Sequence, residues 1–172
     1  MFWTIFSSVL WAADTRVASV IEEGTSIPDI EVSADGRWVG FVEEGSAEVR
    51  ILDTWTWETD SFAPCSAGSP AGLGVLELEE GTTWFVGCSK SEVVTLVPSA
   101  DGFDISDSVV EVDTDEILLL VVGESDVFVI GDPGDGGNPQ AHILDPDTLE
   151  ADGTDGYPST LGYSGVTDAA AN

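Results

Sequence analysis

Short apolar runs separated by polar turns dominate the chain, and the clearest example runs from Ile30 to Asp53. Its β-branched and aromatic residues form runs of strand length. The breaks at Ser33 to Gly36 and Glu43 to Ser46 contain Asp or Gly, and both residues favour tight turns. Glu48 to Asp53 alternates polar and apolar residues, as a half-buried antiparallel strand does. The pattern predicts a meander of three strands, followed by a fourth strand from Thr56 to Phe62.

The rest of the chain repeats this plan less regularly. The second unit is expected to contain strands at Leu73 to Leu78, Thr83 to Cys88 and Val93 to Val97. The third is expected to contain strands at Val109 to Val112, Ile117 to Val122, Val127 to Ile130 and His142 to Leu144. The run from Ile117 to Val122 is apolar throughout, which is typical of a strand buried on both faces. No long stripe with helical periodicity interrupts these units, so the sequence predicts an all-β fold.

The first unit resembles blades of YVTN-type and related β-propeller repeats. Such blades read S-x-D-G-aromatic-apolar and end in two apolar residues followed by D-x-x-T. The resemblance is carried by Ser33, Asp35, Gly36, Trp38, Val39, Val49, Ile51, Leu52 and Asp53. The segment from His142 to Leu149 echoes the ending. The resemblance covers roughly Ile27 to the C-terminus. It implies antiparallel four-stranded meander blades in a partial β-propeller, and the alternative is another antiparallel sandwich built from hairpins.

The spacing of the turns agrees with this resemblance. The turns at Gly36, Gly81, Asp115 and Asp168 lie 45, 34 and 53 residues apart, and a propeller blade takes roughly 40–45 residues. The expected domain covers residues 14–172, with blades at 27–64, 70–108 and 109–156 and the start of another at 158–172. Three blades do not close a ring, which needs about four. The chain is therefore expected to be a piece of a longer propeller, an associating protomer or an open stack of sheets.

Residues 1–13 are uncharged and mostly apolar. The segment has the length of a signal-peptide core and is too short to span a bilayer. It lacks a positively charged start. Two readings stay open, a leader peptide and a buried strand.

The charge balance is extreme, with 33 Asp and Glu against 4 Lys and Arg and a formal net charge of −29. Nucleic acids and anionic membranes are excluded as partners, because binding them requires clustered Lys and Arg. A dense carboxylate surface suits a saline or extracellular setting, in which cations screen the repulsion between carboxylates. The expected location is secreted or extracytoplasmic, and the alternative is the cytoplasm of a halophile.

Two acidic turns are the candidate metal sites. Carboxylate-rich flexible loops provide the oxygen ligands that calcium prefers, so calcium is the candidate cofactor. Neither turn matches the calcium-loop pattern D-x-[DN]-x-[DN]-G-x5-E, and solvated turns that use Asp and Gly for their geometry are the alternative. The candidate ligands are Asp132, Asp135 and Asn138 in the first turn, and Asp145, Asp147, Asp152 and Asp155 in the second.

The cysteines and aromatic residues suggest structural roles. Cys65 and Cys88 form one disulfide in an oxidising compartment or remain two buried thiols. Trp55 and Trp57, two residues apart, would share a face of an extended segment, where they could line a binding surface. The only histidine, His142, is expected in a strand.

No pattern typical of an enzyme occurs in the sequence. There is no G-x-S-x-G motif and no phosphate-binding loop, so no catalytic residue is assigned. The sequence predicts a non-catalytic binding or scaffold module with a protein or glycan partner, or with self-association through open blade edges. The alternative is a fragment of a propeller lyase or hydrolase whose active residues lie outside this chain.

Overall fold

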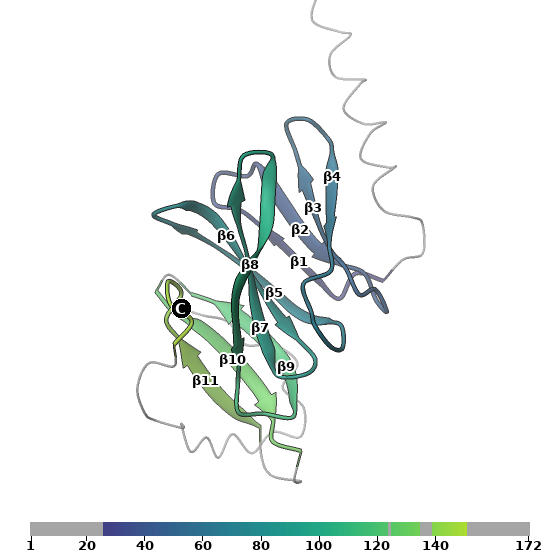
Figure 1. Ribbon diagram of the computed structural model, residues 1–172. Coiled ribbons are helices and arrows are strands. Elements are labelled where there is room, and N and C mark those ends of the chain that lie inside the picture. Colours follow the sequence, from purple (N-terminus) through teal and green to yellow (C-terminus); the bar gives the residue numbers. More distant parts are fainter. Residues whose placement is uncertain (1–25, 124, 135–138, 151–172) are drawn as a thin grey trace, which may run out of the picture.

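The computed structural model describes residues 26–123, 125–134 and 139–150, and these residues form eleven strands and no helix. Figure 1 shows three sheets stacked side by side. The first sheet contains β1 (Asp29–Val32), β2 (Trp38–Val42), β3 (Val49–Asp53) and β4 (Thr59–Phe62) in the order β1-β2-β3-β4. This is the meander that the sequence predicts. Its last strand begins at Thr59 rather than at Thr56, because the residues after Asp53 form a turn.

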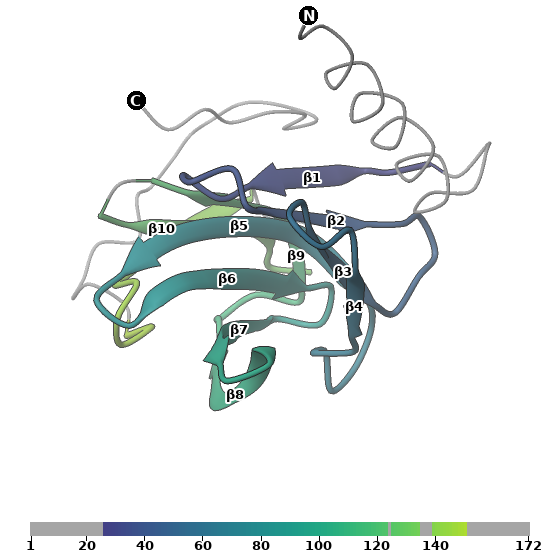
Figure 2. The ribbon, with the colours of Figure 1, turned by 90° about the horizontal axis from the view of Figure 1, so that it is seen from above.

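The second sheet contains β5 (Pro70–Leu78), β6 (Gly81–Cys88), β7 (Glu92–Ser99) and β8 (Gly102–Glu111), again in chain order. Figure 2 shows these four strands one below the other. The prediction of a separate strand at Val109 to Val112 is wrong. Residues 109–111 are the end of β8, and they pair with the start of β7, where Glu92 lies opposite Glu111. The hairpin formed by β7 and β8 is longer than the sequence pattern suggests.

The third sheet contains β9 (Glu116–Val122), β10 (Val127–Asp132) and β11 (Gln140–Leu144), in the order β11-β10-β9. All pairings in the three sheets are antiparallel. Strand β5 lies against both β1 and β9, so the first strands of the three sheets are neighbours. Residues 1–25 and 151–172, which include the segment expected to be a leader or a buried strand, lie outside the described residues.

The middle sheet is buried on both faces, and β6 shows why. Trp84 and Val86 pack into the core shared with the first sheet, whereas Phe85 between them packs into the core shared with the third. All three side chains have no exposed surface. The prediction that the strand from Ile117 to Val122 is buried on both faces is wrong, because Leu118 is 41% exposed. Among the described residues, the third sheet packs against another sheet, the second, through only one of its two faces.

Glycines allow the sheets to approach one another closely. A Cβ atom on Gly40 of β2 would lie 2.3 Å from the ring of Trp84, and one on Gly74 of β5 would lie 2.2 Å from a methyl group of Val122. Real Cβ contacts are not this short, so a large side chain of one sheet fills the space that the glycine leaves in the next. In the part of the chain that the structure describes, no helix is long and apolar enough to cross a membrane.

Candidate functional site: a groove between the first two sheets

The turn from Asp53 to Glu58 connects β3 to β4 and is held by its own side chains. Oδ1 of Asp53 accepts hydrogen bonds from the amides of Trp55 and Thr56, at 2.7 and 3.3 Å. The amide of Trp57 donates to the carbonyl of Asp53, and Trp57 itself has a positive φ of 63°. The prediction that Trp55 and Trp57 share a face of an extended segment is therefore wrong. The turn leaves Trp55 71% exposed and Trp57 half-buried.

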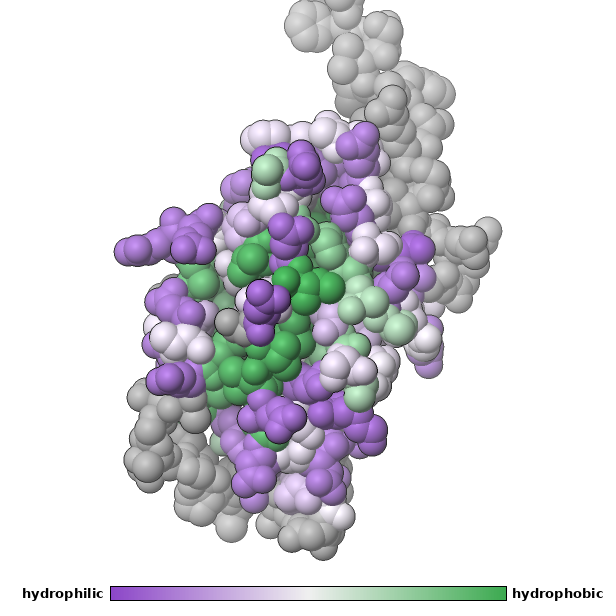
Figure 3. All heavy atoms as spheres, viewed as in Figure 1, coloured by the Kyte–Doolittle hydropathy of each residue, from purple (hydrophilic) through white to green (hydrophobic). Residues whose placement is uncertain are grey.

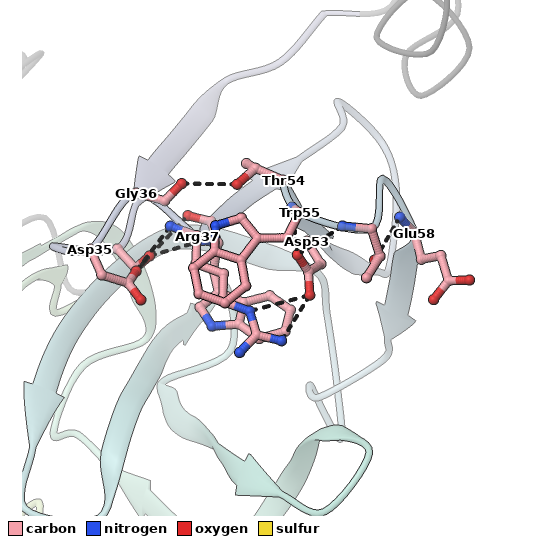
Figure 4. A network of polar contacts seen from close by, with 10 residues as sticks. Asp35, Gly36, Arg37, Asp53, Thr54, Trp55 and Glu58 are labelled. Carbon is pink, nitrogen blue, oxygen red and sulfur yellow. Dashed lines mark hydrogen bonds and ion pairs between the residues drawn. The ribbon is translucent and has the colours of Figure 1, made fainter. Parts of the chain in front are cut away.

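Arg37 connects this turn to the Asp-Gly turn that precedes β2 (Figure 4). Its Nη2 lies 2.9 Å from Oδ2 of Asp53, and its Nε donates to the same oxygen at 3.3 Å. The guanidinium carbon lies 4.2 Å from the ring centre of Trp38 and 4.7 Å from that of Trp55. Both distances are typical of cation–π contacts. An ion pair and two aromatic rings thus hold Arg37 in place.

The environment of Asp53 keeps it ionised. Burial acts to raise its pKa, but the hydrogen bond from Arg37 and those from the amides of Trp55 and Thr56 outweigh burial, and the pKa lies below its ordinary value. Asp53 is the position at which the propeller-like ending D-x-x-T begins. Here, the aspartate both forms the turn and binds an arginine.

A groove of about 450 Å³ lies beside this turn, between the first sheet and the β7–β8 hairpin of the second. Among the described residues that line it, Arg37 is the only cation, whereas Asp53, Glu58, Asp60 and Asp101 supply four carboxylates. Arg37 pairs with Asp53. Among the described residues, no cation forms an ion pair with Glu58, Asp60 or Asp101. The described lining of the groove therefore carries a net negative charge, and Trp55 belongs to the turn whose Asp53, Thr56 and Glu58 contribute to that lining.

A second groove of about 530 Å³ lies between the second and third sheets. It is lined by the β5–β6 hairpin and by the turn from Asp145 to Glu150, which follows β11. In this turn, Oδ1 of Asp145 accepts hydrogen bonds from the amides of Asp147 and Thr148, at 3.0 and 2.9 Å. The amide of Leu149 donates to the carbonyl of Asp145, and φ of Leu149 is 57°. The two turns share these three hydrogen bonds, and the second has one more, from the hydroxyl of Thr148 to Asp145.

The candidate metal ligands are only partly described. Asp135, Asn138, Asp152 and Asp155 lie outside the described residues. Asp132 ends β10, whereas Asp145 and Asp147 follow β11, so they lie at opposite ends of an antiparallel pair. The described residues contain no group of three or more His, Cys, Asp or Glu that could hold a metal ion. The calcium site stays a prediction.

The cysteines and the histidine have structural surroundings. Cys65 and Cys88 form a disulfide with a Cα–Cα distance of 5.7 Å, which attaches the segment after β4 to the end of β6. His142 lies in β11 opposite Val129, and its Nε2 atom is buried without a hydrogen-bond partner. Burial lowers the pKa of His142, and the nearby Asp113 acts in the opposite direction. Burial thus favours the neutral form.

Arg37 and the groove are not among the sites that the sequence predicts. A signal for the ion pair exists, because the predicted β2–β3 hairpin places Trp38 opposite Asp53 and therefore Arg37 beside it. No comparable signal brings Ser99 to Phe103 to the same place, since this hairpin belongs to another sheet.

An apolar patch also crosses the middle of the view in Figure 3, over β8 and β7, and Ile105 and Val109 of β8 are 43% and 48% exposed.

Comparison with known proteins gives the fold. No protein-family model matches the chain, and no curated protein sequence matches it. Among solved structures, it is similar to dihydro-heme d1 dehydrogenase NirN in complex with DHE, with a TM-score of 0.57 and 12% identity over 74% of this chain. It is also similar to the RRP9 WD40 repeats (TM-score 0.55, 11% identity, 71% of this chain) and to BBS1N in complex with ARL6DN (TM-score 0.52, 18% identity, 77% of this chain).

The chain spans 27% of the NirN chain, 34% of the RRP9 chain and 41% of the BBS1N chain. One of these proteins is a dehydrogenase and another is in complex with ARL6DN, so the likeness gives the fold and leaves the activity open. The three stacked meander sheets have the fold of a partial β-propeller.

Proposed function

We propose that this chain is a protein-binding module that takes a cationic segment of its partner into the groove between the first two blades. One observation carries the proposal: hydrogen bonds of its turn and the stacked Arg37 fix the 71% exposed Trp55 in the same turn as Glu58, which lines the groove with Asp60 and Asp101, and none of these three carboxylates pairs with a cation among the described residues. Exposed aromatic rings in fixed positions are typical of binding surfaces, because little conformational entropy is lost when a partner covers them.

The charges determine which partner fits. Glu58, Asp60 and Asp101 attract Lys or Arg side chains and repel acidic ones. The net charge of −29 adds a long-range field that speeds the approach of a cationic segment. The indole of Trp55 offers a cation–π contact of about 0.5–1 kcal/mol at an exposed site. The alternative of a fragment of a propeller lyase or hydrolase stays a prediction.

Binding of a fluorescein-labelled heptalysine peptide, followed by fluorescence anisotropy, tests the proposal. A polycation binds any strongly acidic protein at low salt, so binding by the wild type alone does not locate the site. The affinities of a groove variant and of a control variant with the same net charge are therefore compared. The double variant Glu58→Lys/Asp60→Lys is expected to bind about tenfold more weakly, since two screened charge contacts of roughly 0.4 kcal/mol each reverse sign. The control Glu44→Lys/Glu48→Lys changes the net charge equally, in the β2–β3 hairpin at the other end of the first sheet.

Trp55→Ala adds a test that leaves the charge unchanged. It is expected to weaken binding about three- to fivefold, which corresponds to the loss of one exposed cation–π contact. Equal losses in the groove variant and in the β2–β3 hairpin control would mean that the peptide responds to net charge alone. That result, together with unchanged binding by Trp55→Ala, would reject the groove as the binding site.

A further inference from the structure

The two grooves lie on opposite faces of the middle sheet, at the end where β5 turns into β6 and β7 into β8. Thr82 lines the groove between the first two sheets (the first groove), whereas the next residue, Thr83, lines the second groove. On β7, Val97 lines the second groove and Pro98 the first. Successive residues of a strand point to opposite faces, and stacked sheets lie roughly 10 Å apart. One sheet therefore separates the two grooves, and a short extended segment is long enough to reach from one to the other.

The floor of the second groove contains a buried hydroxyl group that has no partner among the described residues. This group belongs to Thr95 of β7, which is 6% exposed and lines the groove. The register of β7 and β8 shifts beside it, so that residues 106–108 of β8 lie opposite Thr95 alone. Thr83 is 4% exposed and reaches the carbonyl of Gly81 only at 3.5 Å. Buried hydroxyl groups normally have a partner, so these two are placed to accept hydrogen bonds from a ligand.

The walls of the second groove provide negative charge beside apolar surface. Glu79 and Glu80 of the β5–β6 turn and Asp147 of the turn after β11 supply three carboxylates, and no cation is among the described residues that line this groove. Leu78 and Pro146 supply apolar surface. A lysine side chain fits such a lining, because its ammonium group donates to carboxylate and hydroxyl oxygens while its methylene stem lies on apolar atoms.

We propose that the second groove binds a second cluster of Lys or Arg side chains from the same partner segment, with Thr95 as one of the acceptors. The proposal rests on the function proposed above, because it takes the first groove as the other site. The segment crosses the acidic β5–β6 hairpin, of which Thr82 lines the first groove and Glu80 the second. An extended chain covers about 3.3 Å per residue, so the partner has two basic clusters separated by roughly three to six residues.

The experiment compares two fluorescein-labelled peptides by fluorescence anisotropy in 0.15 M NaCl. One is KKKGSGSGS, with a single basic cluster, and the other is KKKGSGSGSKKK, with two. The flexible linker has a root-mean-square length of about 13 Å, which suits the separation of the grooves. We expect the full chain to bind the two-cluster peptide roughly tenfold more tightly, because the second cluster binds at an effective concentration in the millimolar range. Equal affinities for the two peptides would overturn the proposal.

A charge variant of the second groove locates the second site. In Glu79→Lys/Asp147→Lys, the preference for the two-cluster peptide should fall to about twofold, the statistical advantage of two equal clusters. Asp147 uses its amide rather than its carboxylate in the turn, so the turn is expected to persist. The control Glu44→Lys/Glu48→Lys changes the net charge equally and should retain the preference of the wild type.

Equal preferences in the second-groove variant and the control would overturn the second site. If Glu58→Lys/Asp60→Lys nevertheless weakens the binding of both peptides more than the control does, the first groove binds a cationic segment without the second. If neither groove variant differs from the control, the proposed function fails together with this extension.

Thr95→Val tests the hydroxyl group without changing the charge. It should weaken binding of the two-cluster peptide about threefold, the effect of one lost hydrogen bond. The temperature of thermal unfolding should stay the same or rise, because a methyl group replaces a hydroxyl that has no partner. Unchanged binding would mean that Thr95 does not contact the ligand, and a lower unfolding temperature would mean that its hydroxyl is already paired inside the protein. Either result would overturn the assignment of Thr95 to the site.

Discussion

The turns from Asp53 to Glu58 and from Asp145 to Glu150 have the same backbone and different surroundings. Each has an aspartate that accepts two amide hydrogen bonds and a residue with positive φ in the fifth position. In the first turn, the aspartate also binds Arg37, and the third residue is the exposed Trp55. In the second turn, the third residue is Asp147, and Leu149 in the fifth position is 2% exposed.

This difference separates a repeated structural element from a candidate site. The hydrogen bonds of the turn are local, so any blade with an aspartate and a threonine at this spacing can form them. Arg37 and Trp55 are additions of one blade, and the residue in the position of Arg37 in the third sheet is Ser125. Repetition thus accounts for the turn, whereas departure from repetition marks the groove of the first two blades.

The largest expected effect concerns the fifth residue of each turn. Leu149→Ala should lower the free energy of unfolding by about 2–4 kcal/mol, because a buried leucine leaves a cavity. Trp57→Ala should cost less, since Trp57 is half-buried. Urea denaturation monitored by circular dichroism measures both. Leu149→Gly should be more stable than Leu149→Ala by up to about 1 kcal/mol, because glycine adopts the positive φ without strain. A larger loss for Trp57→Ala would mean that the first turn is the more deeply packed.

Much of the first sheet is predictable from sequence for a local reason. Gly36 and Gly45 adopt φ values of 71° and 75° in the two turns that separate β1, β2 and β3, and the strands between them alternate or are apolar. The turn after Asp53 is less predictable, because its residues include Trp57, which has no intrinsic preference for positive φ. Its T-W-T-W sequence suggests an extended strand, and side-chain hydrogen bonds overrule that preference.

Features that depend on neighbouring sheets are not predictable in this way. Burial of β6 on both faces requires a sheet on either side, whereas the equally apolar run from Ile117 to Val122 has a described neighbour on one face only. The groove likewise combines Asp53 with Asp101 from another sheet. The spacing between such residues along the chain contains no information about their distance in space.

Replacement of the turn aspartates, Asp53 and Asp145, should have the next largest effect on stability. Asp53→Ala should lower the free energy of unfolding by about 2 kcal/mol, since it removes two amide hydrogen bonds and the ion pair of the partly exposed Arg37. Asp145→Ala removes amide hydrogen bonds on an exposed turn that forms no ion pair with a described residue, so its loss should be smaller. Asp53→Asn retains an acceptor oxygen for the turn and should lie between wild type and Asp53→Ala. Equal losses at Asp53 and Asp145 in urea denaturation would show that the Arg37 pair contributes nothing measurable.

The smallest expected effect is the response of the two carboxyl groups to salt. Both have a lowered pKa: at Asp53 burial opposes the shift and the hydrogen bond from Arg37 favours it, whereas at Asp145 the amide and hydroxyl of Thr148 are the main causes. Each group therefore stabilises the fold above its ordinary pKa, and this contribution is lost as the pH falls through the lower pKa of the folded state.

Salt distinguishes the two causes, because it screens the charge of Arg37 more than it weakens hydrogen bonds from neutral amides. Carboxyl carbon NMR titrations in 0.05 M and 1 M NaCl should show a higher pKa of Asp53 at high salt, relative to that of Asp145. Salt also screens the electrostatic repulsion that arises from the net charge of −29, and this screening acts on both carboxyl groups in the direction of a lower pKa. Asp145 is the internal reference for that general change. If the two pKa values move together, the charge of Arg37 is not what distinguishes the first turn, and the difference between the turns reduces to the exposed ring of Trp55.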